Sequence, residues 1–255
     1  MRSSGSDVTE ALPWLRGPAD PTLESDEVHV WRVPLRARDS EIPELWRTLA
    51  DDERERAERF HFSRDRVKFI IARGTLRALL GRYVDIDPAR LQFCYGPYGK
   101  PALRDAPGGL RFNLAHSHEL ALCAIAQGCE LGIDLEYERE RIAIEQIATK
   151  FFSAREAAAL CGLPDEKKRA AFYNCWTRKE AFIKLLGSGL SLPLDGFDVS
   201  LVPGEPAALL SVAGDVRRAA RWTLRELKPA TGYFAALALE GHDRQIRLWY
   251  WPDIY

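Results

Sequence analysis

Two acidic side chains lie close together in the segment 131–136, which reads LGIDLE. Because side chains alternate along a strand, Asp134 and Glu136 would share one face, and the apolar residues around them would take the other. Carboxylates so placed lie about 7 Å apart and repel each other unless a cation or solvent screens them. Oxygen donors of this kind suit magnesium, which takes one or two carboxylates plus substrate phosphates. A solvated strand face is the alternative that the pattern leaves open.

A second group stands on a helix predicted over about residues 166–186. Its apolar residues share one face, and Glu180 and Lys184 lie just beside that face, one turn apart, in the order that favours a pair. Lys179 falls inside the apolar face, where an unpaired ammonium is costly, so it must meet a carboxylate or reach solvent. An exposed, stabilising pair is the alternative for Glu180 and Lys184.

Basic residues gather between positions 54 and 82, where nine Lys and Arg stand against three acids. They are Arg54, Arg56, Arg59, Arg64, Arg66, Lys68, Arg73, Arg77 and Arg82. Two later segments could contact the same anion: the turn 96–101, which holds Lys100 between two prolines, and the end of a predicted strand, which delivers His116. We therefore expect a local anion site. A solvated helix face with a plain turn is the alternative.

The composition excludes several classes of protein. The 255 residues carry 36 Lys and Arg against 37 Asp and Glu, so there is no overall basic field to hold nucleic acid or anionic lipid. The longest apolar run, Leu120–Ala126, is far shorter than the roughly 20 residues that cross a bilayer. Neither a P-loop, a zinc-ligand spacing nor a GxSxG elbow is present in the sequence.

The five cysteines form no CxxC pair, and the first residues are polar and lack an apolar signal core. We therefore expect buried, reduced cysteines in a cytoplasmic protein.

The elements that must position these residues fall into two similar series. We predict a loose N-terminal leader over 1–26, an N-terminal half over 27–128 and a C-terminal half over 129–255. Each half shows a long helical pattern, over most of 51–83 or over 166–186, surrounded by short strands. Because the closing strands follow one another directly, an α+β fold is favoured over a parallel sheet.

Taken in order, the motifs resemble those of a known family. They are GKP at 99–101, FNLAHS at 112–117, GIDLE at 132–136 and WTRKEAFIK at 176–184, with RFHF at 59–62 before them and GSGLSLPL at 187–194 after them. The ordered set resembles the 4′-phosphopantetheinyl transferases of the surfactin-synthetase-activating (Sfp-like) type over about residues 50–200.

The resemblance implies a monomer built from two similar α/β halves, a pseudo-dimer whose active site lies in the cleft between them and holds coenzyme A and magnesium. It also implies a reaction, in which the 4′-phosphopantetheine arm of coenzyme A moves to a serine of an acyl or peptidyl carrier protein and adenosine 3′,5′-bisphosphate is released. Such an enzyme serves fatty-acid, polyketide or nonribosomal peptide biosynthesis.

The resemblance further implies roles for individual residues. Magnesium would be held by Asp134, Glu136 and Glu180. Lys184 would neutralise the pyrophosphate, and Glu180 would also activate the serine. The implied catalytic group consists of Glu180, Lys184 and Asp134. The nucleotide phosphates would be bound by Lys100, His116, Arg56, Arg66, Lys68 and Arg73, together with Lys184.

Two positions depart from the family pattern. Glu53 stands near a place where lysines are common, so Arg54 and Arg56 would have to compensate, and Ala115 stands where a small hydroxyl is common, so any contact there would have to come from the backbone. Two other functions remain open: a non-catalytic module that binds coenzyme A or a carrier protein, and a metal-dependent phosphodiesterase. A binding module would be expected to lose a carboxylate or Lys184, and this sequence keeps them all.

We expect the carrier protein to dock beside the cleft on the segment 137–152, where apolar residues of the predicted helix 144–152 form a stripe. Ile144, Ile147 and Phe151 recur at helical spacing, and the stripe either completes the core or meets a helix of the partner. We expect Phe151 to be in the core more than Ile144.

Overall fold

The structure, a computed structural model, describes residues 12–36, 40–189 and 192–251. The helices are α1 (Ile42–Thr48), α2 (Asp51–Glu58), α3 (Ser63–Val84), α4 (Ile144–Phe151), α5 (Ala154–Cys161), α6 (Asp165–Leu186) and α7 (Val216–Ala219). The strands are β1 (Leu15–Arg16), β2 (Glu27–Pro34), β3 (Phe93–Tyr95), β4 (Pro101–Leu103), β5 (Leu110–Ser117), β6 (Leu120–Gln127), β7 (Leu131–Tyr137), β8 (Phe197–Val199), β9 (Leu209–Val212), β10 (Trp222–Leu227), β11 (Tyr233–Glu240) and β12 (Gln245–Tyr250).

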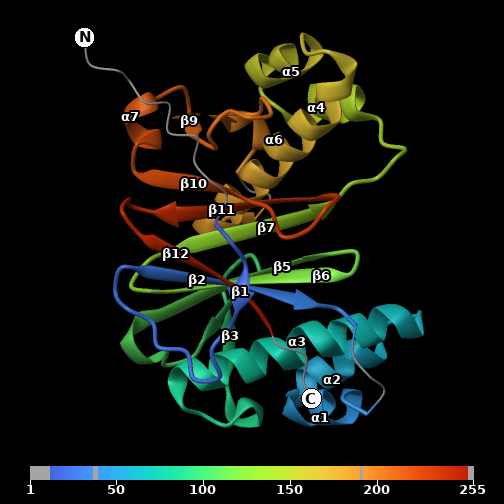
Figure 1. The fold of residues 1–255 in the computed structure, drawn as a ribbon, viewed down its shortest axis with the longest axis vertical. Coiled ribbons are helices and arrows are strands. Elements are labelled where there is room, and N and C mark those ends of the chain that lie inside the picture. Colours follow the sequence, from blue (N-terminus) through green and yellow to red (C-terminus); the bar gives the residue numbers. More distant parts are fainter. Residues whose placement is uncertain (1–11, 37–39, 190–191, 252–255) are drawn as a thin grey trace.

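Two halves repeat one order of elements, and Figure 1 shows them stacked. In the first half β2 is followed by α1–α3, the β3–β4 pair, β5 and β6; in the second β7 is followed by α4–α6, the β8–β9 pair, β10 and β11. The strands of the two sheets lie in matching orders, β2-β6-β5 and β7-β11-β10. Each half also carries a helix of 22 residues, α3 or α6. The predicted α+β class with two similar halves is confirmed.

The last strand of the chain returns to the first half. β12 pairs in parallel with β2, so the larger sheet has the order β1-β12-β2-β6-β5, and Figure 1 shows the red β12 beside the blue β2. The division at residues 128 and 129 stays a prediction. By its pairing, however, β12 belongs with the N-terminal sheet, because the edge of β2 opposite β6 is the one it covers.

The predicted leader is ordered in part. Residues 1–11 lie outside the described residues, whereas Leu15 and Arg16 pair in parallel with the end of β12. The Gly17 amide donates to the Tyr250 carbonyl at 3.1 Å, and the Trp14 indole donates to the Lys228 carbonyl at 2.9 Å. These contacts with the distant end of the chain correct the expectation of a loose segment for residues 12–26.

The predicted helix over 51–83 is interrupted. α2 ends at Glu58 and α3 begins at Ser63, and Phe62 between them has an extended backbone. The Phe60 ring packs against Phe69 of α3, with 5.4 Å between the ring centroids, which requires the chain to turn back at this point. Helical periodicity on both sides concealed the turn.

Apolar cores join the elements. One core lies between α3 and the first sheet, and another lies between α6 and the second sheet. A third joins the two sheets through fully buried side chains of β2, β6, β7 and β11, among them Val30, Leu122, Ile133 and Leu237. The interface between the two sheets therefore has an apolar core, which holds β7 and β11 against β2 and β6.

Two expectations about buried residues have clear outcomes. Lys179 is fully buried and pairs with Glu156 at 2.7 Å, so the predicted carboxylate partner is confirmed. The stripe on α4 is the reverse of the prediction: Ile144 and Ile147 pack partly buried against the second core, while Phe151 is 36% exposed. Ala148 and Phe152 take the buried positions of this helix instead.

All five cysteines lie in the described part of the chain and are unpaired. Cys123, Cys129 and Cys175 are buried as expected, but Cys94 and Cys161 are exposed. Among the described helices, none combines the length and the apolarity that crossing a membrane requires.

Candidate active site

The site is built on the contact between α6 and β7, which depends on Gly132. A Cβ atom at this position would lie 2.1 Å from the Ala181 carbonyl oxygen and 2.3 Å from the Leu185 nitrogen. The helix therefore rests directly on the strand, as it could over no larger residue. Asp134 follows two residues later on the same face of β7, and it meets the side of α6 that carries Lys184.

The Lys184 Nζ atom lies 2.6 Å from the Asp134 Oδ1 atom. The other oxygen of Asp134, Oδ2, is buried and accepts no hydrogen bond from any described residue. A buried carboxylate oxygen without a partner is costly unless something else binds it. Asp134 thus offers one free oxygen next to a lysine.

Two further carboxylates lie within the field of Asp134. Desolvation by burial, and then the negative charge of Asp134, raise the pKa of Glu136 and of Glu180. Glu136 adds a smaller upward effect on the pKa of Glu180, and Lys184 opposes the rise at both. The structure therefore brings together all four acidic and basic residues predicted from β7 and α6.

These residues fit a hard divalent ion by their chemistry. The donors are all carboxylate oxygens, and the Oδ2 atom of Asp134 has no hydrogen-bond donor among the described residues. The pKa values of Glu136 and Glu180 are raised, and a positive charge close to them would lower these pKa values. Among the described residues, no three His, Cys, Asp or Glu side chains lie close enough together to hold a metal ion as they stand. The predicted set Asp134, Glu136 and Glu180 is thus close in space but not arranged around a common point.

A positive field surrounds His116 on the adjacent strand, β5. Desolvation, and then the charges of Lys184, Arg56 and Lys68, lower the pKa of its imidazole. Such a field is suited to an anion, which would reverse the effect and favour the charged ring.

The other basic candidates at this end of the molecule have partners within the protein. The Lys68 Nζ atom lies 2.7 Å from Glu119 and donates to the His118 carbonyl at 2.6 Å. Arg56 and Arg66 are exposed, and their guanidinium groups lie over the rings of Phe69 and Trp46, each 5.3 Å from the centroid.

The structure does not bring Arg73 to this group. It is buried in an ion pair with Glu53, which also pairs with Arg77, and its guanidinium donates to the Tyr95 hydroxyl at 2.9 Å. The predicted contact of Arg73 with nucleotide phosphates therefore stays a prediction that this placement does not support. Glu53, the departure from the family pattern, is itself buried and needs both arginines as counterions.

Lys100 is also engaged within the protein. Its ammonium donates to Glu130 Oε2 at 3.2 Å, to the Leu131 carbonyl at 3.0 Å and to the Leu185 carbonyl at 3.1 Å. A lysine has three N–H donors, so these bonds use all of them. Burial lowers the pKa of Lys100, and Glu130 opposes that shift. All three Lys100 donors are thus used within the protein, although its side chain also lines the pocket beside Glu180 and Lys184, so its predicted contact with nucleotide phosphates stays a prediction.

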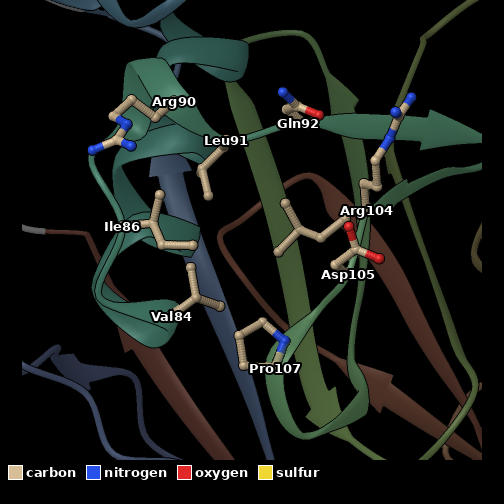
Figure 2. Close-up of a pocket in the computed structure, with 9 residues that line it drawn as sticks. Val84, Ile86, Arg90, Leu91, Gln92, Arg104, Asp105 and Pro107 are labelled. Carbon is tan, nitrogen blue, oxygen red and sulfur yellow. The ribbon is translucent and has the colours of Figure 1, made fainter.

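A pocket of about 300 Å³ opens beside Glu180 and Lys184. The turn holding Tyr98 and Gly99 forms one wall, and Asn113 and Leu114 of β5 form another. The third wall is formed by α6 and by Gly187 and Gly189, which follow it. A separate pocket of about 150 Å³ lies beyond the end of α3. Figure 2 shows its apolar side chains, such as Ile86 and Leu91, pointing toward one another while Arg90 points away. The second pocket is lined by none of the predicted site residues.

Sequence reasoning assigned no role to Asn113, Ser117 or Glu130. Asn113 and Ser117 are four residues apart on β5 and so share one face, which was a visible signal of a common contact. Glu130 carried no such signal, because its partners Lys100 and Arg111 come from separate segments.

Comparison with known proteins agrees with this architecture. A model of the 4′-phosphopantetheinyl transferase superfamily matches residues 130–238, and a model of the N-terminal region of 4′-phosphopantetheinyl transferases matches residues 36–129. The 4′-phosphopantetheinyl transferase HetI of Nostoc sp. is 42% identical over 240 residues, which are 93% of this chain and 98% of the relative. The 4′-phosphopantetheinyl transferase Sfp of Bacillus subtilis is 35% identical over 153 residues, 60% of this chain and 66% of the relative.

These matches extend over both halves, and the site residues of β5, β7 and α6 lie within them. Together with the repeated fold and the acidic and basic groups at the junction of the halves, they show that this chain belongs to the 4′-phosphopantetheinyl transferase superfamily.

Proposed function

We propose that this chain transfers the 4′-phosphopantetheine arm of coenzyme A to a serine of an acyl or peptidyl carrier protein and releases adenosine 3′,5′-bisphosphate. The observation that carries the proposal is the group formed by Asp134, Glu136, Glu180 and Lys184 beside the positive field at His116. A phosphoryl centre needs its oxygens neutralised and a nucleophile held in line, and such a group supplies both.

Magnesium would be held by Asp134, Glu136 and Glu180. The orphaned Oδ2 of Asp134 is the best support for this part of the proposal. When bound, magnesium would neutralise charge on the pyrophosphate oxygens.

The chain's own residues have distinct tasks. Lys184 donates to the pyrophosphate from the position it takes beside Asp134. The Glu180 carboxylate accepts the proton of the carrier serine as the serine oxygen bonds to the phosphorus next to the pantetheine arm. The P–O bond between this phosphorus and the nucleotide breaks, and adenosine 3′,5′-bisphosphate leaves. His116, Arg56, Lys68 and Arg66 bind the nucleotide phosphates, and the pocket lined by Tyr98 and Ile183 receives part of the substrate.

We also propose that the enzyme acts as a cytoplasmic monomer with no nucleic-acid or membrane partner. The near-zero net charge supports the last point.

One assay tests the reaction against its alternatives. The chain is incubated with coenzyme A, magnesium and an apo carrier protein, and the carrier is weighed by mass spectrometry. We expect a gain of one phosphopantetheine on the carrier. Phosphopantetheine released to water would identify a phosphodiesterase, and binding without turnover would identify a non-catalytic module.

The metal assignment predicts complete dependence on a divalent ion. Excess chelator should abolish transfer, and magnesium should restore it better than zinc, because the proposed ligands are all oxygen donors. Initial rates across a magnesium titration check this expectation. Transfer that continues undiminished in chelator would exclude the metal site.

Lys100→Met should reduce stability more than it reduces affinity for coenzyme A. The change removes the Lys100 donor from two carbonyls and from the Oε2 atom of Glu130, so we expect a loss of about 1–3 kcal/mol in the free energy of unfolding. The KM for coenzyme A should stay within about threefold, well under the tenfold that 1.4 kcal/mol of lost binding would give.

Denaturant unfolding and steady-state kinetics measure the two effects of Lys100→Met. Lys228→Met is a matched control, since Lys228 forms an exposed pair with Glu226 at 3.4 Å and should affect neither quantity. If stability is unchanged and the KM for coenzyme A rises sharply, Lys100 binds the nucleotide phosphates and this prediction is wrong.

A further inference from the structure

The strands β5 and β7 lie side by side at the junction of the halves, yet they belong to different sheets. Two side chains of β5 bond to the backbone of β7 across this seam. Asn113 Oδ1 accepts from the Ile133 amide at 2.8 Å, and Ser117 Oγ accepts from the Tyr137 amide at 3.0 Å. Each bond joins residues 20 positions apart, so the two strands run in the same direction in constant register.

The two residues of β7 whose amides make these bonds flank the proposed metal ligands along the strand. Asp134 and Glu136 lie between Ile133 and Tyr137, so the segment that carries both carboxylates is fixed at its two ends by the other half of the molecule. Each bond satisfies an amide at the edge of β7, opposite the side that pairs with β11.

Ser117 makes a second contact that Asn113 does not. Its hydroxyl also donates to Glu136 Oε2 at 3.2 Å. One hydroxyl therefore accepts from the backbone of Tyr137 and donates to the side chain of Glu136, which uses both capacities of the group. The orientation of the Glu136 carboxylate is thus tied to the position of β5.

We infer that Ser117 is a positioning residue that orients Glu136 for the metal, while Asn113 fixes the register of β7 against β5. The inference rests on the proposed function, because it takes Glu136 as a ligand. Hydrogen bonds to a ligating carboxylate restrict its rotation, and the loss of such an outer partner typically weakens metal binding about 10- to 100-fold.

The fold should survive the loss of the hydroxyl. β7 pairs with β11 along seven residues, and Asn113 still fixes the other end of the segment. Ser117 is half-buried at the end of β5, so its removal opens little space.

The test measures metal binding directly. Manganese, as a paramagnetic substitute for magnesium, is titrated into the full chain in the presence of coenzyme A and followed by electron paramagnetic resonance. Ser117→Ala should raise the manganese Kd at least about 10-fold. Ser117→Thr keeps the hydroxyl and should stay within about threefold of the original protein, less than the 10-fold that loss of the outer partner gives.

A matched control removes a similar hydroxyl far from the site. Ser211 is buried and donates to Asp198 at 2.6 Å, so Ser211→Ala deletes the same kind of bond and should leave manganese binding unchanged. If Ser117→Ala does not fold, Ser117→Val and Ser117→Thr replace it as a pair of nearly identical shape that differ in the hydroxyl.

The outcomes separate this inference from the proposed function. Glu136→Gln should weaken manganese binding if the metal site is right. If Glu136→Gln weakens binding and Ser117→Ala or Ser117→Val does not, the role of Ser117 is refuted and the metal site stands. If Glu136→Gln itself leaves binding unchanged, the proposed ligand set is wrong.

Discussion

Glu180→Gln should leave a folded protein that is almost inactive. The substitution keeps the size of the side chain, and Gln and Glu have similar helix propensity, so α6 should be unaffected. The proposed base for the serine proton disappears, as does one proposed metal ligand. Positioned general bases contribute about 10²–10⁴-fold to rates, so we expect a loss of at least 10²-fold in kcat.

The environment of Glu180 places it in the acidic group and not on a solvated helix face. Burial and the charges of Asp134 and Glu136 raise its pKa, a shift that a bound metal would oppose. If Glu180 were only half of a helical pair with Lys184, its loss would change stability by about 0.5 kcal/mol and leave the rate unaltered. The two interpretations therefore differ by orders of magnitude in kcat.

Glu166→Gln provides the matched control for Glu180→Gln. Glu166 lies in the first turn of the same helix and is exposed, so this variant should transfer at the original rate. Circular dichroism and a carrier-modification assay on both variants complete the comparison. A folded Glu180→Gln protein within about threefold of the original rate, well below the range for a general base, would end the catalytic assignment.

The grouping of the proposed site residues on β7 and α6 was predictable because their signals are local. Alternation places Asp134 and Glu136 on one face of a strand, and helical spacing places Glu180 next to Lys184. The position of Lys179 in an apolar face predicted that it meets a carboxylate or reaches solvent, and the structure shows the carboxylate of Glu156. In each case the argument needed a few neighbouring residues and the period of one element.

The basic residues were harder because composition does not distinguish the inside of a helix bundle from its surface. Arg56 and Arg73 belong to the same charged stretch, yet Arg56 is exposed near His116 while Arg73 is buried against Glu53. That difference depends on how α2 packs on α3, which involves contacts between separate elements. Lys100 is a similar case, because its acceptors Glu130, Leu131 and Leu185 all lie 30 or more positions away along the chain.

The parts of the fold that sequence reasoning missed are also long-range. β12 pairs with β2 although more than 200 residues separate them, and β1 is ordered by the same strand. No periodicity within either segment indicates such a partner. The exposure of Phe151 likewise follows from the orientation of α4 on the second core, where Ala148 and Phe152 point inward.

Gly132→Ala should disrupt both the stability and the activity of the enzyme. The new Cβ would lie 2.1 Å from the Ala181 carbonyl oxygen and 2.9 Å from the Leu185 Cα atom, and these are backbone atoms that cannot rotate away. α6 must therefore move off β7. Overpacking of this kind typically costs about 1–3 kcal/mol, and contacts this short with backbone place the expected loss at the upper end.

The same movement should affect catalysis beyond its effect on folding. Glu180 and Lys184 are carried by α6 and Asp134 by β7, so a shift of the helix separates the groups that must act together. Misplacement by about 1 Å can reduce a rate 10²-fold. Gly162→Ala is the control, because its Cβ would meet only ordinary contacts, the nearest being the Ala158 carbonyl at 3.5 Å. The measurements are denaturant unfolding, and kcat under conditions in which both variants are fully folded. If Gly132→Ala matches Gly162→Ala in stability and in kcat, α6 has room on β7 and this contact does not set the geometry of the site.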